Sequence, residues 1–216
     1  MELDDMKAAW QTLDRRLDTQ AALNLHMFKE GKLDKLRRGL RPLVWGQAIQ
    51  IVAGAFVAIW GGGFWPKHLH EPDLLIAGLL VHASGISMIA LGVSMQVLIG
   101  RIDYSAPVLA IQRQLAQLRK VYIYGGMAVG LPWWLLWIPY LMVASGYVGV
   151  DLYRHAPSVI WIGTAIGVAG LLATWGFVRW AATRPRLAKR MQDNAAGGSI
   201  RKAQATLDEI AHFEQE

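Results

Sequence analysis

The chain has 216 residues, of which 54% are hydrophobic and 18% charged, and it contains no cysteine. The absence of cysteine excludes a disulfide scaffold, a cysteine nucleophile, a thiolate zinc site and an iron–sulfur cluster. The charged share lies below the value of about 25% that is usual for soluble domains, and the formal net charge of +6 comes with long uncharged stretches. The composition therefore favours a small membrane bundle over a soluble domain.

The N-terminal segment, residues 1–42, is expected to form helices in the cytoplasm. Its apolar residues alternate between spacings of three and four, as in the seam of a coiled coil: Leu3, Met6, Trp10, Leu13 and Leu17. The opposite face carries aspartates such as Asp14 and Asp18, which an anionic bilayer would repel. We therefore predict that this stripe binds protein rather than lipid.

Four runs contain no Asp, Glu, Lys or Arg, and they cover residues 43–65, 74–99, 121–150 and 157–178. About 20 apolar residues in a helix cross the hydrocarbon core, and in lipid each span must satisfy its own backbone hydrogen bonds. The predicted fold class is an all-α integral membrane protein with four transmembrane helices and amphipathic or coiled-coil cytoplasmic helices. Its domains would be residues 1–42, the transmembrane part 43–178 and the C-terminal part 179–216.

The third run is longer than one span needs, and it contains Pro132 and Pro139. Because each proline removes a helix hydrogen bond, two arrangements stay open. Either the helix of the preceding loop continues to about Gly125 and the span begins near Gly130, or the span is kinked.

Two further segments have an apolar stripe at helical spacing. In the loop 100–120 and just beyond it, the stripe contains Val108, Ile111, Leu115, Leu118 and Tyr122, and near the C-terminus it contains Ile200, Ala203, Leu207 and Ile210. A lone amphipathic helix of this length is marginal in water. These helices either lie on the membrane surface or, as we favour, pack together within one chain or between copies.

The basic residues predict the orientation. Lys67 and Arg154 lie in the short links 66–73 and 151–156, and all other Lys and Arg lie in 1–42, 100–120 or 179–216. Since basic residues stay on the cytoplasmic side, both termini are expected there.

Residues that flank the spans are expected to contact anionic lipids: Arg37, Arg38, Arg41, Arg184, Arg186, Lys189 and Arg190. No nucleic-acid motif is present, so no nucleic-acid partner is expected.

Glycines mark the expected packing faces of the spans. The second run has Gly78, Gly85 and Gly92 at intervals of seven, the third has Gly126 and Gly130, and the fourth has Gly163, Gly167 and Gly170. Small residues let helices approach closely in a membrane.

The sequence contains no catalytic motif, so we expect a non-enzymatic protein without a cofactor. His82 lies within the second run; we expect a neutral imidazole bonded between helices, with a pH- or ligand-responsive group as the alternative. The outer links hold weak candidates for metal ligands, namely His68, His70, Asp151 and His155. Their spacing matches no strong motif, and we predict no metal site from them.

The opening residues, Met1-Glu2-Leu3-Asp4-Asp5-Met6-Lys7-Ala8-Ala9-Trp10-Gln11, together with Leu40-Arg41-Pro42-Leu43, resemble a group of poorly characterised bacterial four-span inner-membrane proteins. Some of these are encoded beside extracytoplasmic-function sigma factors. The resemblance covers mainly the first 50 residues; Met6 stands where the pattern usually has Leu. It implies a regulatory or accessory role in the bacterial inner (plasma) membrane and carries over no catalytic residues.

These observations predict a multi-pass, oligomeric inner-membrane protein whose cytoplasmic helices form a regulatory or scaffolding protein-binding surface. The expected partners are membrane lipids, further copies of the chain and a cytoplasmic regulator. One alternative is a small oligomeric channel or transporter. Another is a metal- or pH-responsive sensor, and a third is a membrane enzyme that acts on lipid through the histidines of the outer links.

Overall fold

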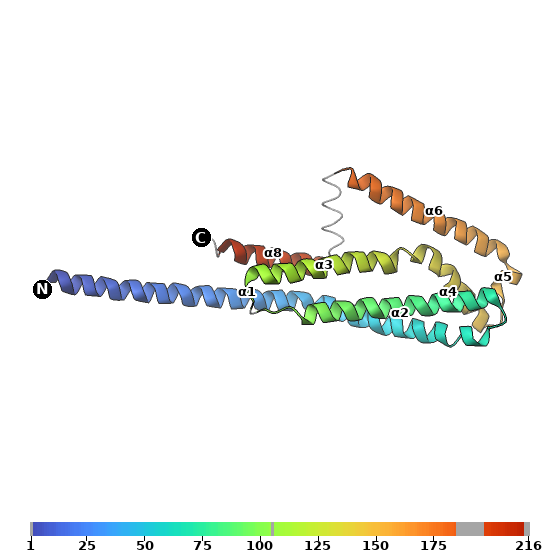
Figure 1. The fold of residues 1–216 in the computed structure, drawn as a ribbon, viewed down its shortest axis with the longest axis horizontal. Helices are drawn as coiled ribbons and strands as arrows, with labels where there is room; N and C mark the ends of the chain where they lie inside the picture. The colour runs from blue at the N-terminus through green and yellow to red at the C-terminus, as the bar shows by residue number, and fades with distance from the viewer. Residues whose placement is uncertain (1, 105, 185–196, 214–216) are drawn as a thin grey trace.

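The computed structural model describes residues 2–104, 106–184 and 197–213, and throughout these ranges the only regular structure is helical. Figure 1 shows an elongated arrangement in which the long first helix extends well beyond the others. The elements are α1 (Glu2–Gly62), the 3-10 helix η1 (Trp65–Lys67), α2 (Pro72–Gly100), α3 (Val108–Gly130), α4 (Trp133–Tyr147), α5 (Leu152–His155), α6 (Pro157–Ala182) and α8 (Gly198–Phe213).

Three helices are long and apolar enough to cross a membrane: they cover Glu30–Lys67, Pro72–Gly100 and Pro157–Ala181. A fourth crossing is present if α3 and α4, which are bent by 49° relative to each other, form one broken span. The predicted all-helical, membrane-type architecture is confirmed at this level.

A bend between α3 and α4 interrupts the third run at its first proline. α3 continues past Gly125 to Gly130, and α4 begins at Trp133 after the short break at Leu131 and Pro132. Proline at position 132 has no N–H to donate to the preceding turn, whereas Pro139 is accommodated inside α4. The third run therefore consists of the end of one helix and a second helix bent against it, and this second helix ends at Tyr147 rather than at residue 150.

α1 runs without a break from the N-terminal stripe into the first apolar run, even though Pro42 lies inside it. Pro42 is exposed, so water can reach the carbonyl that loses its N–H partner. Leu36 and Leu40 before the proline and Leu43 after it pack in the same hydrophobic cluster, which holds the helix straight across this position.

α1 and α2 lie side by side along a seam of glycines (Figure 1). A Cβ atom on Gly85 would lie 2.4 Å from the backbone nitrogen of Ala58, and one on Gly61 would lie 2.6 Å from the nitrogen of His82. Gly92 faces Ile51 across the same seam, at 2.5 Å from its Cγ1 atom. The backbones are thus close enough that only glycine fits at these positions.

The glycines of the fourth run also form a packing face. Cβ atoms on Gly167 and Gly170 would lie within 2.3 Å of the backbone oxygen and the ring of Trp134, respectively, and one on Gly163 would contact Trp137. These contacts dock the first half of α6 on α4, and the rest of α6 diverges from the other helices (Figure 1).

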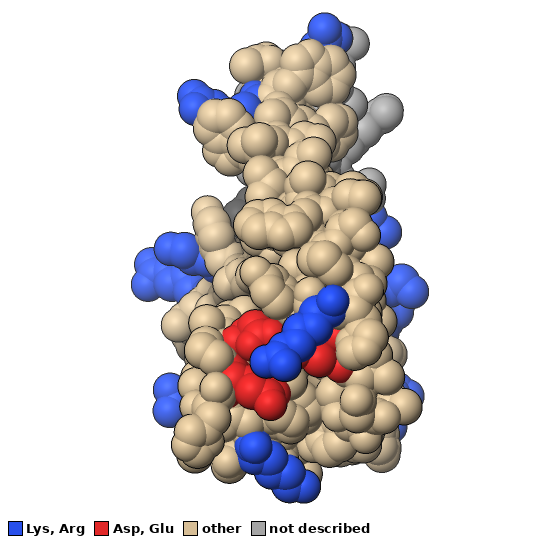
Figure 2. Space-filling model, turned by 90° about the vertical axis from the view of Figure 1, so that its right-hand side faces the viewer, with Lys and Arg blue, Asp and Glu red and all other residues tan. Residues whose placement is uncertain are grey.

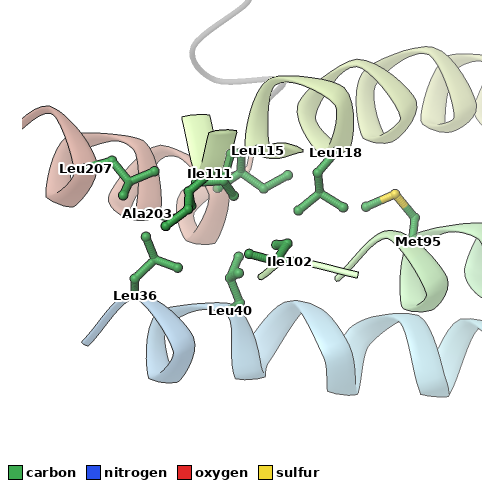
Figure 3. Packing of buried hydrophobic residues seen from close by; sticks show 10 residues of the cluster. Leu36, Leu40, Met95, Ile102, Ile111, Leu115, Leu118, Ala203 and Leu207 are labelled. Atoms are coloured by element: carbon green, nitrogen blue, oxygen red, sulfur yellow. The ribbon is translucent and has the colours of Figure 1, made fainter. Parts of the chain in front are cut away.

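The amphipathic segments pack together within one chain. We call this cluster the amphipathic bundle, and Figure 3 shows how side chains from α1, α3 and α8 meet in it with Met95 of α2 and Ile102. Its fully buried members include Leu36, Leu40, Ile111, Leu115, Leu118, Ile200, Ala203 and Leu207. The prediction that the stripes pack together is confirmed for these positions, and the alternative of a separate membrane-surface helix does not apply to them.

A hydrogen-bonded ion pair at the edge of this bundle predicts an acid-sensitive contact. Lys32 Nζ of α1 lies 2.5 Å from Glu209 Oε1 of α8, and this hydrogen bond lowers the pKa of Glu209 below 4.5. A carboxyl group whose pKa is lowered in the folded state stabilises the fold at pH values above its ordinary pKa. This stabilisation is lost as the pH falls through the lowered pKa. We expect wild type to melt above Glu209→Gln at pH 6 and the difference to be smaller at pH 3.5, as measured by circular dichroism. An equal difference at both pH values would contradict this assignment, and added salt should reduce it because the pair is exposed.

Candidate functional site

The most distinctive feature of the molecule is the part of α1 that precedes the amphipathic bundle. We call residues 2–29 the projecting segment, and Figure 1 shows it extending beyond α3 and α8. Trp10 is 64% exposed and Leu13 is 50% exposed. Both belong to the predicted protein-binding stripe, whose other members Leu3, Met6 and Leu17 have side chains outside the described residues. The two described members thus present a large apolar surface that the chain itself leaves uncovered.

Met27 extends this exposed surface toward the bundle, since its side chain is 64% exposed. Lys7, Arg16 and Gln20 are also exposed. Every side chain of the projecting segment whose burial the structure describes is therefore exposed to solvent. By contrast, Leu36 and Leu40, about two and three turns beyond the end of the segment on the same helix, are fully buried.

Basic residues of α1 lie just before the first apolar run, which begins at residue 43. Arg37, Arg38 and Arg41 are exposed, as expected for side chains that contact lipid headgroups. Arg37 and Arg41 line a hollow of about 580 Å³ together with Tyr104. Burial raises the pKa of Tyr104, and the nearby charge of Arg37 offsets only part of this rise. The phenol therefore stays protonated and able to donate a hydrogen bond. Two guanidinium groups and one hydroxyl suit a phosphate oxygen.

At the end of the fourth run only one of the predicted lipid contacts can be examined. The Arg184 guanidinium lies 4.9 Å from the ring centre of Trp180, and Arg179 lies 5.1 Å from that of Trp175. Such pairs of cation and aromatic ring are typical of the boundary between apolar and aqueous phases. Arg186, Lys189 and Arg190 lie outside the described residues.

His82 bonds between helices, which is the arrangement expected from the sequence for a neutral imidazole. Its Nδ1 atom lies 2.7 Å from the carbonyl oxygen of Ala58, so this nitrogen carries the hydrogen and donates it across the α1–α2 seam. The ring also lies against Gly62, where a Cβ atom would be 2.9 Å from Nδ1. The histidine therefore has a packing partner and a hydrogen-bond partner.

The candidate metal ligands of the outer links are not brought together as a metal site. Across the described ranges, which include all four residues, no group of three or more potential ligands has suitable geometry. His68 Nδ1 bonds the Phe64 carbonyl at 3.0 Å, and His155 Nδ1 bonds the Asp151 carbonyl at 2.8 Å. His70 is exposed. Local backbone contacts thus engage one ring nitrogen each of His68 and His155.

Asp151 has a structural role of its own at this end of the molecule. Its side chain caps α5 by accepting hydrogen bonds from the backbone N–H groups of Tyr153 and Arg154, and its Oδ2 atom lies 3.0 Å from Arg154 Nε. Figure 2 shows this end, where acidic side chains gather with a basic side chain across them. The carboxylate serves as a helix N-cap.

Amide side chains in the apolar runs bond between helices, as their residue type in these runs predicts. Gln96 donates to the Val44 carbonyl at 2.8 Å and Gln50 to the Met88 carbonyl at 3.2 Å, so both join α1 to α2. Gln47 is buried, and its Oε1 atom has no hydrogen-bond partner. A buried amide oxygen without a partner is costly and marks the place where a further ligand would be accommodated.

With this geometry in view, the chain was compared with known proteins. No protein-family model, no curated protein and no solved structure matches it. The functional argument therefore depends on the molecule's own surfaces, and the projecting segment is the strongest of these.

Proposed function

We propose that this chain is a non-enzymatic protein of the bacterial inner membrane, with four spans and both termini in the cytoplasm. Its projecting segment would be a protein-binding surface through which copies of the chain associate and present a regulatory scaffold. The observation that carries this proposal is the exposure of Trp10 and Leu13 on a helix that continues unbroken into the first apolar run.

The continuity of α1 supports a scaffolding role. A helix of 61 residues is about 90 Å long at a rise of about 1.5 Å per residue. Because no break separates the stripe from the span, whatever binds Trp10 is held at a fixed height above the membrane. The amphipathic bundle braces this helix at its midpoint through Leu36 and Leu40, so the projecting segment is presented as a stiff arm.

A second copy of the chain is the occupant that the pattern favours. With Leu3, Trp10 and Leu17 at a positions of a heptad repeat, Glu2 and Lys7 occupy g and e positions. In a parallel pair the g residue of one helix faces the e residue of the next heptad on its partner, and here these residues have opposite charges. The seam is short, so association would also draw on the membrane spans.

Replacing both Trp10 and Leu13 by Asp tests the proposal. We expect the solubilised particle to fall from a multiple of the 23.9 kDa chain mass to a single chain, because two charges would have to be buried in the seam. Light scattering coupled to size-exclusion chromatography gives the mass, and deletion of residues 1–20 should have the same effect. The matched control is Ala8→Asp, which helical periodicity places opposite the stripe. An unchanged mass in both variants would contradict the proposal.

A further inference from the structure

A cavity lies between the first three long helices, within the apolar part of the chain. Its volume is about 420 Å³, and its lining includes Gln47 and Gln50 from α1, Leu91 from α2, and Tyr122, Gly126 and Gly130 from α3. This volume falls in the range of about 300–1,000 Å³ that is usual for small-molecule sites. The cavity is distinct from the projecting segment and from the hollow beside Arg37.

The two glycines on α3 point to a surface that is kept open. The Gly126–Gly130 pair has the spacing of a helix-packing motif, yet a Cβ atom on either residue would meet nothing within 4 Å. The glycines of the packing faces behave differently, since they contact neighbouring helices or tryptophan rings: Gly78, Gly85 and Gly92 of α2, and Gly163, Gly167 and Gly170 of α6. The absence of side chains at Gly126 and Gly130 therefore leaves space in the cavity instead of allowing close helix packing.

The polar side chains that line the cavity are uncharged, namely Gln47 and Gln50 of α1 and Tyr122 of α3. Gln47 is 7% exposed, and its Oε1 atom has no hydrogen-bond partner. Rotation of the amide by a half-turn exchanges Oε1 with Nε2, so that either a donor or an acceptor can face the space. None of the lining residues is Asp, Glu, Lys or Arg, and a charged ligand would therefore be buried without a counter-charge.

We infer that this cavity binds an uncharged single-chain amphiphile of the monoacylglycerol type. Its hydroxyl and ester groups would bond with the Gln47 amide, and its chain would follow the apolar walls formed by residues such as Leu91 and Met127. This inference rests on the membrane arrangement of the proposed function, because only a protein that spans a bilayer meets such a ligand at the depth of this cavity. A plain hydrocarbon chain would leave the Gln47 amide unpaired, whereas an alcohol satisfies it.

The test uses the full chain in lipid nanodiscs with a photoactivatable monoacylglycerol that has a diazirine in its chain. We expect labelled peptides to contain residues 122–131, and excess unlabelled monoacylglycerol to remove most of the label. Gly126→Leu should fill the cavity without a clash and lower labelling at least fivefold. The matched control is Gly46→Leu, which also adds a side chain where a Cβ meets nothing within 4 Å but lies outside the cavity.

A second variant tests recognition of the polar head. Gln47→Leu removes the amide and should lower labelling several-fold while the chain stays folded, as checked by its melting temperature. Equal competition by a lysophospholipid with an anionic head would show that only the chain is bound, and this would overturn the inference. Unchanged labelling in Gly126→Leu would also overturn it.

The outcomes separate this inference from the proposed function. If the Trp10 and Leu13 variant keeps its mass but the wild type is labelled in the cavity, the scaffold proposal fails alone. If Gly126→Leu changes the particle mass instead of the labelling, then Gly126 and Gly130 form an interface between copies and the cavity inference fails alone. If the chain does not enter nanodiscs, the shared membrane arrangement is wrong and both proposals fail.

Discussion

Substitution of Gly85 by alanine is expected to lower the melting temperature of the protein by about 5 °C. The new Cβ atom would lie 2.4 Å from the Ala58 nitrogen and 2.7 Å from the Gly54 carbonyl oxygen. Both are backbone atoms, so relief requires α1 and α2 to move apart. Overpacking costs up to about 3 kcal/mol and the better helix propensity of alanine returns about 1 kcal/mol. A net loss of about 2 kcal/mol in a chain of this size corresponds to about 4–8 °C.

The effect of Gly85→Ala should be specific to the seam. The matched control is Gly46→Ala in α1, where the Cβ atom meets nothing within 4 Å. Here the propensity gain acts alone, and we expect stabilisation of about 0.5–1 kcal/mol. Thermal unfolding of the solubilised protein, followed by circular dichroism, measures both. If the two variants melt at the same temperature, α1 and α2 do not pack as closely as the structure indicates.

The glycine pattern also shows what a sequence can and cannot reveal. Gly78, Gly85 and Gly92 recur every seven residues, so their shared face on α2 is predictable from helical periodicity. Their partners on α1 are harder to find, because Gly54 and Gly61 lie among the other small residues of the first run. The pairing of glycines between α1 and α2 depends on how far the short link around η1 shifts one helix along the other.

A motif alone also does not say what it packs against. Gly163 and Gly167 have the same spacing as Gly126 and Gly130, yet the first pair accommodates Trp137 and Trp134 while the second faces a cavity. The difference arises at Pro132, because the bend of 49° between α3 and α4 turns α4 toward α6. The position of the proline is visible in the sequence, but the direction of the bend depends on tertiary packing.

The amphipathic stripes predicted the interior of the bundle because helix faces follow directly from spacing. Leu115 and Leu207 come from two separate segments, and each lies at a stripe position that the structure buries. The contacts of the histidines in the outer links could not be predicted in the same way. Short links place His68 and His155 next to backbone carbonyls of their own helical turns, and residue type without regular periodicity does not predict such contacts.

The C-terminal helix gives the second large effect, since Leu207→Asp is expected to release α8 from the bundle. Leu207 is fully buried among residues of α1 and α3 (Figure 3). Loss of a buried leucine side chain costs about 2–5 kcal/mol, and a carboxylate in its place would also need a partner that the apolar surroundings do not provide. We expect α8 to undock while the apolar helices stay folded.

Hydrogen exchange of the amides in residues 198–213 measures this release. In the wild type these amides should be protected, whereas in Leu207→Asp protection should fall to the level of an isolated peptide, because a lone helix of 16 residues is marginal in water. The control is Ala205→Asp, which adds the same charge on the exposed side of α8 and should keep the protection. Retained protection in Leu207→Asp would mean that α8 does not need the apolar contacts of α1 and α3.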